Sequence, residues 1–296
     1  MTENVSSPDE ADPRESEEAR EPRETADARP IEVDGSVARP ARVYDYVLGG
    51  KDNFAADREV AEHAAAARGE GGIDHARAAV KADREFLGRA VRYLVADAGI
   101  RQLLDIGTGI PHGDNIHEIA QNIAPESRIV YVDDDAVVLA HAHRLRKSTP
   151  QGATAYVDAD PRQVDKVLRQ APETLDMSQP IAVTLFGTLH HVLDEDEPHK
   201  IVSRLLDAVP SGSYLAISHL TDDIMTEAVT EAAKRINEGG TGFRLIVRSG
   251  DSISRFFEGL DMVEPGLVTA DKWHPDGESA SDGLEMPYYV AIGRKP

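Results

Sequence analysis

The sequence of 296 residues contains no cysteine. Disulfide bonds, zinc–thiolate sites and cysteine nucleophiles are therefore excluded. It also contains no run of about eighteen apolar residues, so no membrane-spanning helix and no membrane partner are expected. The first residues are acidic and polar and lack the basic start and apolar core of a signal peptide. These absences predict a cytoplasmic protein.

Basic residues are scarce. Lysine and arginine number 32 against 53 aspartates and glutamates, which gives a formal net charge of -21. Such a surface repels phosphate backbones, and nucleic-acid binding usually needs basic patches. Nucleic acid is therefore not an expected partner, although a local basic groove would remain compatible with one. The simplest role of the charge is solubility.

Aromatic residues make up only 5% of the chain and are almost missing from its first part. Residues 1–35 are rich in Glu, Asp, Arg, Pro and Ser. Such a segment buries too little apolar surface to offset the entropy lost on ordering, so a disordered acidic tail is predicted. It serves either to solubilise the protein or to bind a partner.

Residues 36–99 predict an N-terminal helical cap. Val43, Tyr44, Val47 and Leu48 fall on one helical face, and Gly49-Gly50 then break the helix. An alanine-rich helix follows over about 57–67. A long amphipathic helix is predicted over about 73–98, because apolar residues recur there at spacings of three and four.

Residues 100–296 alternate between apolar runs and helical segments, which predicts an α/β fold of the Rossmann-like type. Strands separated by helices form a mostly parallel sheet with right-handed crossovers. The last strand suits an antiparallel position. The expected strands are residues 102–106, 128–133, 154–157, 181–186, 214–218, 262–268 (in two pieces) and 288–292.

The turn after the first of these strands indicates a nucleotide site. Asp105 and Ile106 end the strand, and Gly107-Thr108-Gly109 follow before a helical segment. The N–H groups at the start of that helix would point back at a ligand in the turn. Asp133 at the tip of the second strand suits the two hydroxyls of a ribose. Alternatively, both acids only cap turns.

The spacing of the glycines argues against a dinucleotide. The pyrophosphate fingerprint needs a third glycine at position 112, where this chain has His112, followed by Gly113. A carboxylate at Asp105 would also repel a pyrophosphate, whereas it suits the ammonium group of S-adenosylmethionine. The pattern therefore favours S-adenosylmethionine over NAD.

Several motifs carry a family resemblance. The turn of residues 105–109 resembles motif I of the class I S-adenosylmethionine-dependent methyltransferases, and Leu189-His190-His191-Val192 resembles the segment after their fourth strand. Residues 210–215 resemble their Pro-Gly-Gly turn, with Ser211 in place of the first glycine. Residues 40–54 resemble the opening signature of an actinobacterial S-adenosyl methyltransferase family long described as a domain of unknown function.

The resemblance runs from about Arg39 to the C-terminus and implies the class I methyltransferase fold, with a seven-stranded sheet and S-adenosylmethionine as cofactor. It implies that Asp134 contacts the adenine region and that Asp160 binds the adenine amino group, a role for which Asp158 competes. The set of expected cofactor residues in the core is Asp105, Gly107, Thr108, Gly109, Asp133, Asp134 and Asp160.

Three groups in the cap are further cofactor candidates. The polar loop that contains Gly50 and Asn53 forms either a lid over the cofactor or only a helix C-cap turn. Tyr46, one turn earlier, would line the pocket. Arg84 on the long helix either pairs with the cofactor carboxylate or is solvated.

His190 and His191 are the candidate catalytic residues. Methyl transfer to oxygen or nitrogen can need a base, and the pKa of histidine suits that role. Many related enzymes carry this pair without using it, and His219 is a further candidate. No metal site is expected. Trp273 either walls the acceptor pocket or is a buried structural residue.

The sequence therefore predicts an S-adenosylmethionine-dependent methyltransferase that acts on an unidentified small-molecule acceptor. Two alternatives remain. One is a regulatory or interaction protein that binds S-adenosylmethionine or S-adenosylhomocysteine without turnover, and the other is an NAD-dependent oxidoreductase. The sequence leaves the acceptor atom and the oligomeric state open.

Overall fold

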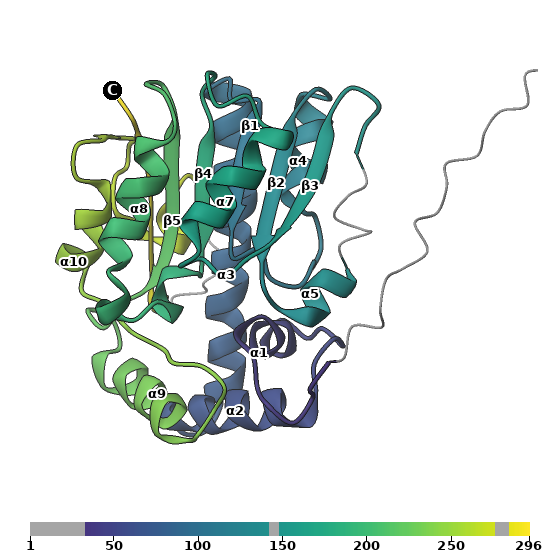
Figure 1. The fold of residues 1–296 in the computed structure, drawn as a ribbon. Coiled ribbons are helices and arrows are strands. Elements are labelled where there is room, and N and C mark those ends of the chain that lie inside the picture. The colour runs from purple at the N-terminus through teal and green to yellow at the C-terminus, as the bar shows by residue number, and fades with distance from the viewer. Residues whose placement is uncertain (1–32, 142–147, 276–283) are drawn as a thin grey trace, which may run out of the picture. The chain divides into compact units, whose positions relative to one another are not determined.

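A computed structural model describes residues 33–141, 148–275 and 284–296. Within these residues the centre is an eight-stranded sheet of order β3-β2-β1-β4-β5-β8-β6, with β7 also paired to β8 (Figure 1). The strands are β1 (Gln102–Ile106), β2 (Arg128–Asp133), β3 (Ala153–Asp158), β4 (Ala182–Phe186), β5 (Tyr214–Leu220), β6 (Asp261–Met262), β7 (Val268–Thr269) and β8 (Tyr288–Arg294).

The predicted α/β fold is confirmed. Strands β1 to β5 pair in parallel, and β8 runs antiparallel to β5, as the sequence pattern indicated. The sheet has one strand more than the expected seven because the sixth strand is divided. Its two short pieces, β6 and β7, both pair with β8.

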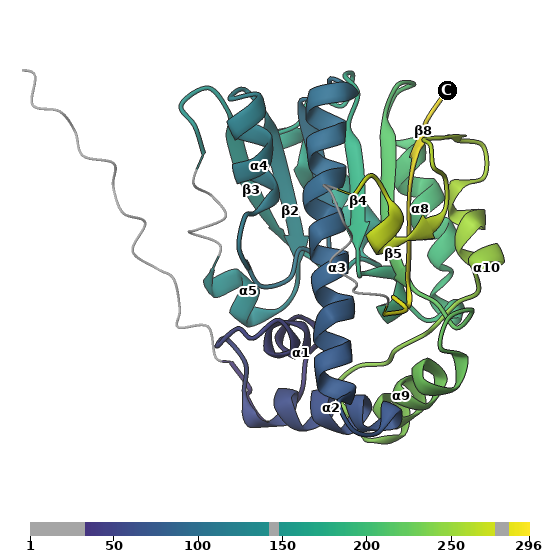
Figure 2. The same ribbon diagram turned by 180° about the vertical axis from the view of Figure 1, so that it is seen from behind.

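Helices cover both faces of the sheet, so successive residues of a central strand enter different cores. Leu103 and Ile129 belong to the core beneath α3 (Gly72–Arg92) and α4 (Ile116–Ile123), as Figure 2 shows. Leu104 and Val130 belong to the core on the other face. The helices of that face are α7 (Val164–Gln170), α8 (Pro198–Asp207) and α10 (Gly250–Ser254). Burial on both faces explains why these strands are continuously apolar.

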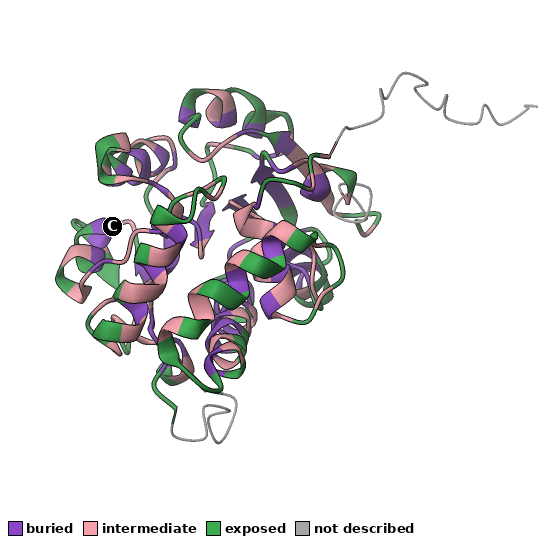
Figure 3. Ribbon diagram, turned by 90° about the horizontal axis from the view of Figure 1, so that it is seen from below, coloured by how far each residue is buried: buried purple, intermediate pink, exposed green. Residues whose placement is uncertain are grey.

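A cap of helices covers the carboxyl edge of the sheet. It consists of α1 (Pro40–Val47), α2 (Ala55–Ala65), the first half of α3, and α9 (Thr226–Glu238). Helix α9 follows β5 in the chain but packs on α2, where Ala233 and Ile236 meet Val60 and Ala64. The cap is thus completed by a segment from the second half of the chain. Figure 3, seen from this side, shows buried strand ends framed by partly exposed helices.

The described residues belong to one compact unit, and α3 belongs to both its cap and its core. Residues 1–32 of the predicted tail lie outside the described residues. None of the helices in the described ranges is long and apolar enough to cross a membrane. The remaining short helices are η1 (Ala66–Arg68), η2 (Tyr93–Asp97), α5 (Ala136–Ala140), η3 (Ala171–Glu173), η4 (Leu189–His191), η5 (Asp194–Asp196), η6 (Arg255–Phe257) and η7 (Ala270–Lys272).

Candidate functional site

A cavity of about 350 Å³ lies at the carboxyl edge of the sheet, beneath the cap. Its walls come from the start of α1, the middle of α3, the loops that follow β1, β2, β3 and β4, and residues 242–244. This is the edge at which open α/β sheets bind their ligands. The residues that line the cavity therefore form the candidate site.

The glycine turn lies where the sequence predicted it, and Gly107, Thr108 and Gly109 all line the cavity. Gly107 has a positive φ of 74°, and a Cβ on it would come within 2.4 Å of Thr188 Oγ1. Only glycine avoids both the backbone strain and this clash. The Gly107 N–H donates to Val132 O at 2.8 Å, which ties the turn to β2.

Asp133 ends β2 and lines the cavity with a carboxylate of fixed orientation. Its Oδ2 accepts from the Gly109 N–H at 2.7 Å, and its Oδ1 accepts from the Asp135 N–H at 3.0 Å. Burial, followed by the charges of Asp134 and Asp135, raises the pKa of Asp133 to about 7. Each oxygen keeps a lone pair with which it can accept a further hydrogen bond.

Asp105 is the second buried carboxylate of the cavity. Its Oδ1 accepts from Thr184 Oγ1 of β4 at 2.6 Å. Burial raises the pKa of Asp105 to about 6. Arg84 lines the same part of the cavity, and its charge acts on Asp105. Its Nη2 donates to His112 O at 2.8 Å and Asp114 O at 3.0 Å, so it also holds the loop after the glycine turn.

The loops after β2 and β3 contribute Asp134 and Asp160. Asp158, the alternative to Asp160, ends β3 and is not among the described residues that line the cavity. The Asp160 carboxylate accepts from Arg162 Nε at 2.7 Å and pairs with the same guanidinium through Nη2. Burial would raise the pKa of Asp160, but the hydrogen bonds from Arg162 outweigh it and lower that pKa.

The loop of residues 49–53 does not line the cavity as the described residues define it, which corrects the predicted placement of Gly50 and Asn53. The buried carboxylate of Asp45 accepts from Asp52 N at 2.9 Å and Asn53 Nδ2 at 2.8 Å. A Cβ on Gly50 would lie 1.9 Å from Asp45 Oδ1. A buried carboxylate needs such donors. The loop is therefore a turn that wraps Asp45, as in the C-cap alternative.

Tyr46 also lies outside the cavity as the described residues define it, because its hydroxyl donates to Glu62 Oε1 of α2 at 2.6 Å. The start of α1 lines the cavity instead, through Arg39 and Tyr44. Sequence reasoning assigned neither of them to the site. In the sequence, the indication that Tyr44 faces the interior was its position on the apolar face of a predicted helix.

The cap is tied to the carboxyl edge of the sheet by a buried ion pair. Arg42 Nε of α1 lies 3.3 Å from Asp135 Oδ2, and both side chains are nearly inaccessible to solvent. Asp135 also caps α5, because its Oδ1 accepts from the Val137 N–H at 2.7 Å. The pair joins α1 to the segment that directly follows Asp133.

The two candidate catalytic histidines differ in position. His191 of η4 lines the cavity, and its Nδ1 lies 3.1 Å from Arg244 O. His190 lies behind it, buried, with its ring against those of His191, His219 and Tyr288. Burial lowers the pKa of His191 to about 4 and holds that of His190 well below its usual value. Both rings are neutral at pH 7.

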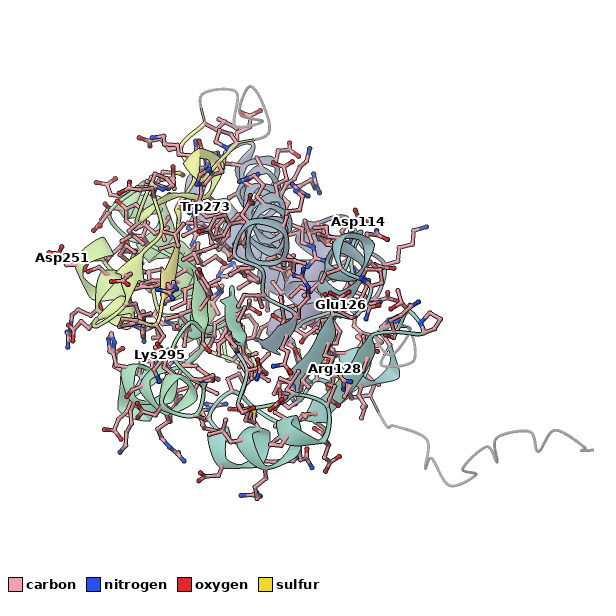
Figure 4. All side chains as sticks on the ribbon, turned by 90° about the horizontal axis from the view of Figure 1, so that it is seen from above. Asp114, Glu126, Arg128, Asp251, Trp273 and Lys295 are labelled. Carbon is pink, nitrogen blue, oxygen red and sulfur yellow. The ribbon has the colours of Figure 1, made fainter. Side chains whose placement is uncertain are left out.

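Two other candidates are fully buried and do not line the cavity within the described residues. His219 is buried and its Nε2 lies 2.8 Å from Arg248 Nη1. Trp273 is fully buried against Phe86 and Tyr93. Figure 4 shows it within the packed side chains, whereas Asp251 lies at the periphery. In the described part of the chain no group of three or more His, Asp or Glu side chains is arranged to hold a metal ion.

The structure adds one carboxylate that sequence reasoning missed. Asp83 of α3 lines the cavity and is only 2% exposed. Its Oδ2 accepts from the Tyr44 hydroxyl at 3.0 Å. Burial raises the pKa of Asp83 to about 6, opposed by hydrogen bonding from Ser218 and Tyr44 and by the charge of Arg84. The signal in the sequence was an acid within the apolar stripe of a predicted helix.

Comparison with known proteins identifies relatives along most of the chain. A family model described as S-adenosyl methyltransferase matches residues 26–296. A DUF574 family protein from Streptomyces avermitilis MA-4680 is 42% identical over 90% of this chain and 100% of that chain, with a TM-score of 0.84. A candidate methyltransferase from Thermobifida fusca YX is 37% identical over 88% of this chain and 96% of that chain, with a TM-score of 0.79. No curated protein matches the chain.

Proposed function

Because the chain belongs to the S-adenosyl methyltransferase family, we propose that its cavity binds S-adenosylmethionine across the ends of β3, β2 and β1 and presents the methyl group toward β4. The protein is an S-adenosylmethionine-dependent methyltransferase. When bound, the cofactor supplies an electrophilic methyl carbon attached to a positively charged sulfur.

The observation that carries the proposed arrangement is the carboxylate of Asp133. Two backbone N–H groups fix its orientation, at 2.7 and 3.0 Å, and the turn of Gly109 reaches it directly. An oriented carboxylate at the end of the second strand suits the two ribose hydroxyls. We assign Asp133 this role, with the backbone of residues 107–109 alongside the cofactor.

The opposite charges of Asp105 and Arg84 fit the amino-acid end of the cofactor. That end carries an ammonium group and a carboxylate, and the two side chains lie in one part of the cavity. We assign Asp105 to the ammonium group and Arg84 to the carboxylate, since each ion then faces the opposite charge. Asp134, directly after β2, and Asp160, near the end of β3, are assigned to the adenine region.

The acceptor is assigned to the part of the cavity beside β4, where Phe186, His191 and Phe243 provide ring surfaces. A cavity of about 350 Å³ and rings on its walls support a small molecule as acceptor. Catalysis then rests mainly on holding the acceptor in line with the methyl group. We place the reaction in the cytoplasm, in keeping with a chain that lacks cysteine.

Calorimetric titration tests this assignment. S-adenosylhomocysteine and S-adenosylmethionine should bind one to one, and NAD should not bind. Asp133→Ala should weaken the binding by about 1–3 kcal/mol, because two ribose hydroxyls lose their acceptor. Asp158→Ala is the matched control, since that aspartate also ends a strand but does not line the cavity within the described residues. If Asp133→Ala binds S-adenosylhomocysteine as tightly as the wild-type protein, the assignment of Asp133 to the ribose hydroxyls is wrong.

A further inference from the structure

Asp83 lies near the ends of β4, β5 and β8, apart from the ends of β2 and β3 at which Asp133 and Asp160 are found. Along the sheet edge, Asp160, Asp133 and Asp105 follow β3, β2 and β1 in that order. The Asp83 side chain extends from α3 toward the strands that follow β1 in the sheet order, which are β4, β5 and β8. A Cβ on Gly187, which follows β4, would lie 3.8 Å from Asp83 Oδ2, and the Asp83 carboxylate interacts with Ser218 of β5 and Tyr288 of β8. It therefore faces the acceptor part of the cavity.

Two buried polar atoms at this place lack hydrogen bonds. Asp83 Oδ1 and His190 Nδ1 have no partner of good geometry among residues 33–141, 148–275 and 284–296. Both side chains flank Gly187, whose added Cβ would be 3.6 Å from the His190 ring. Buried polar groups are normally satisfied, and of these two side chains only that of Asp83 lines the cavity within the described residues, so Asp83 Oδ1 indicates a place for a polar group of a ligand.

The charges of the cavity leave Asp83 without a counterion. Asp160 pairs with Arg162, and Asp135 pairs with Arg42. In the proposed arrangement Asp105 and Asp133 face the cofactor. Asp83 forms no ion pair with any residue that the structure describes, although Arg84 follows it on α3. A buried carboxylate with no ion-pair partner among the described residues favours a ligand that brings a positive charge or a proton.

Asp83 is also better suited than the histidines to receive a proton. His191 lines the cavity, but burial lowers its pKa to about 4. His190 does not line the cavity within the described residues. Burial raises the pKa of Asp83 to about 6, which makes this carboxylate the stronger base of the two cavity groups at neutral pH.

We propose that Asp83 binds the amino group of a small amine acceptor and takes a proton from it during methyl transfer. This inference rests on the proposed function. The step starts from an ammonium nitrogen hydrogen-bonded to the Asp83 carboxylate. One proton moves from nitrogen to the carboxylate, the freed nitrogen electron pair forms the bond to the methyl carbon, and the electron pair of the carbon–sulfur bond stays on sulfur. The products are a methylated ammonium, a neutral thioether and protonated Asp83.

Two probes of nearly equal shape, benzylamine and benzyl alcohol, test this proposal. Each is titrated at pH 8 into the protein saturated with S-adenosylhomocysteine. The wild-type protein should prefer the amine by about tenfold or more, because a hydrogen bond between two charged groups is made only with the amine. Asp83→Asn should abolish this preference, and the control Asp158→Asn should keep it.

The preference for the amine should also fall between pH 8 and pH 5, as Asp83 becomes protonated. The titratable groups that face Asp83 are Tyr44 of α1, Arg84 of α3, His190 of η4 and Tyr288 of β8. The pKa of each tyrosine is raised, mainly by burial, and that of His190 is lowered by burial, so these three stay neutral across this range.

Equal binding of the two probes, or no binding of either while S-adenosylhomocysteine binds, would overturn the role of Asp83 and leave the proposed function standing. A preference retained in Asp83→Asn would overturn it as well. If that variant fails to fold, the pH dependence in the wild-type protein decides, because a preference independent of pH contradicts the proposal. Failure of S-adenosylhomocysteine to bind would instead overturn the proposed function.

Discussion

Three carboxylates of the cavity, those of Asp83, Asp105 and Asp133, are almost fully buried, and burial raises the pKa of each. An acid whose pKa is higher in the folded state than in the unfolded chain destabilises the fold when it is ionised. Its favourable contribution is complete below the unfolded pKa and is lost as the pH rises through the folded pKa. The ligand-free protein is therefore less stable at neutral pH than it would be with these carboxylates protonated. Their ionised forms are the ones that can bind a cation.

The variant Asp105→Asn tests this destabilisation of the fold by an ionised, buried carboxylate. The pKa of Asp105 is raised from 3.8 to about 6, and a shift of about two units corresponds to about 3 kcal/mol. The asparagine carbonyl can still accept from Thr184, so we expect the variant to be more stable than the wild-type protein by up to this amount at pH 8. The difference should shrink as the pH falls from about 6 to about 4.

Urea unfolding of both proteins without cofactor at pH 8, 6 and 4.5 measures this difference. The buried histidines take up protons on unfolding in the acid part of this range, because burial lowers their pKa in the folded protein, but they are common to both proteins and cancel. A stability difference that does not vary with pH would contradict the raised pKa. In the same variant S-adenosylhomocysteine should bind more weakly, because Asp105 is assigned to its ammonium group.

At the scale of residues, the sequence predicted those residues of the candidate site whose place at the cavity local geometry dictates. Asp105, the glycine turn and Asp133 follow from where apolar strands end. Asp83 was missed because only tertiary packing decides which acid on a helix faces a cavity. Gly50 and Asn53 were misplaced, since a polar loop with glycine has the same pattern whether it surrounds a ligand or a buried side chain such as that of Asp45.

At the scale of elements, the turn between α1 and α2 offers a matched pair of glycines. Gly49 has a φ of 85° and no atom within 4 Å of an added Cβ, whereas an added Cβ on Gly50 would meet the Asp45 carboxylate. Gly49→Ala should cost about 1–2 kcal/mol of unfolding free energy from backbone strain alone. Gly50→Ala should cost more, because Asp45 is buried and held by several donors and cannot move freely.

Thermal or urea unfolding of the two variants, with affinity for S-adenosylhomocysteine measured alongside, distinguishes a turn that wraps Asp45 from a lid over the cofactor. A turn that serves only to wrap Asp45 leaves the affinity of the folded variants unchanged. Loss of affinity in Gly50→Ala without loss of stability would instead restore the lid that the sequence suggested. The Arg42–Asp135 ion pair joins α1 to the segment after Asp133, and Asp52 of this loop also reaches it, because Asp52 Oδ2 lies 3.3 Å from His141 Nε2 at the end of α5.

At the scale of the whole described unit, the alternation of strands and helices was sufficient to predict the sheet. Each central strand is a short apolar run followed by turn residues, and such runs need helices on both faces. The position of α9 could not be predicted in this way. Its apolar face packs on α2, more than 150 residues earlier in the chain, and no local pattern specifies so distant a partner.

The charge of the molecule fits its proposed ligands. The chain carries a formal net charge of -21, and six aspartates line the cavity. Such a field attracts a cationic ligand and repels an anionic one. S-adenosylmethionine carries a positive sulfur, and an amine acceptor would carry a second positive charge.

A crystal structure of the protein with S-adenosylhomocysteine bound tests the central claim most directly. We predict that both ribose hydroxyls lie within hydrogen-bond distance of Asp133, with the adenine near Asp160 and the amino-acid end between Asp105 and Arg84. The sulfur should then point toward Gly187 and Asp83. A ligand bound in the reverse direction, or outside this cavity, would contradict the account.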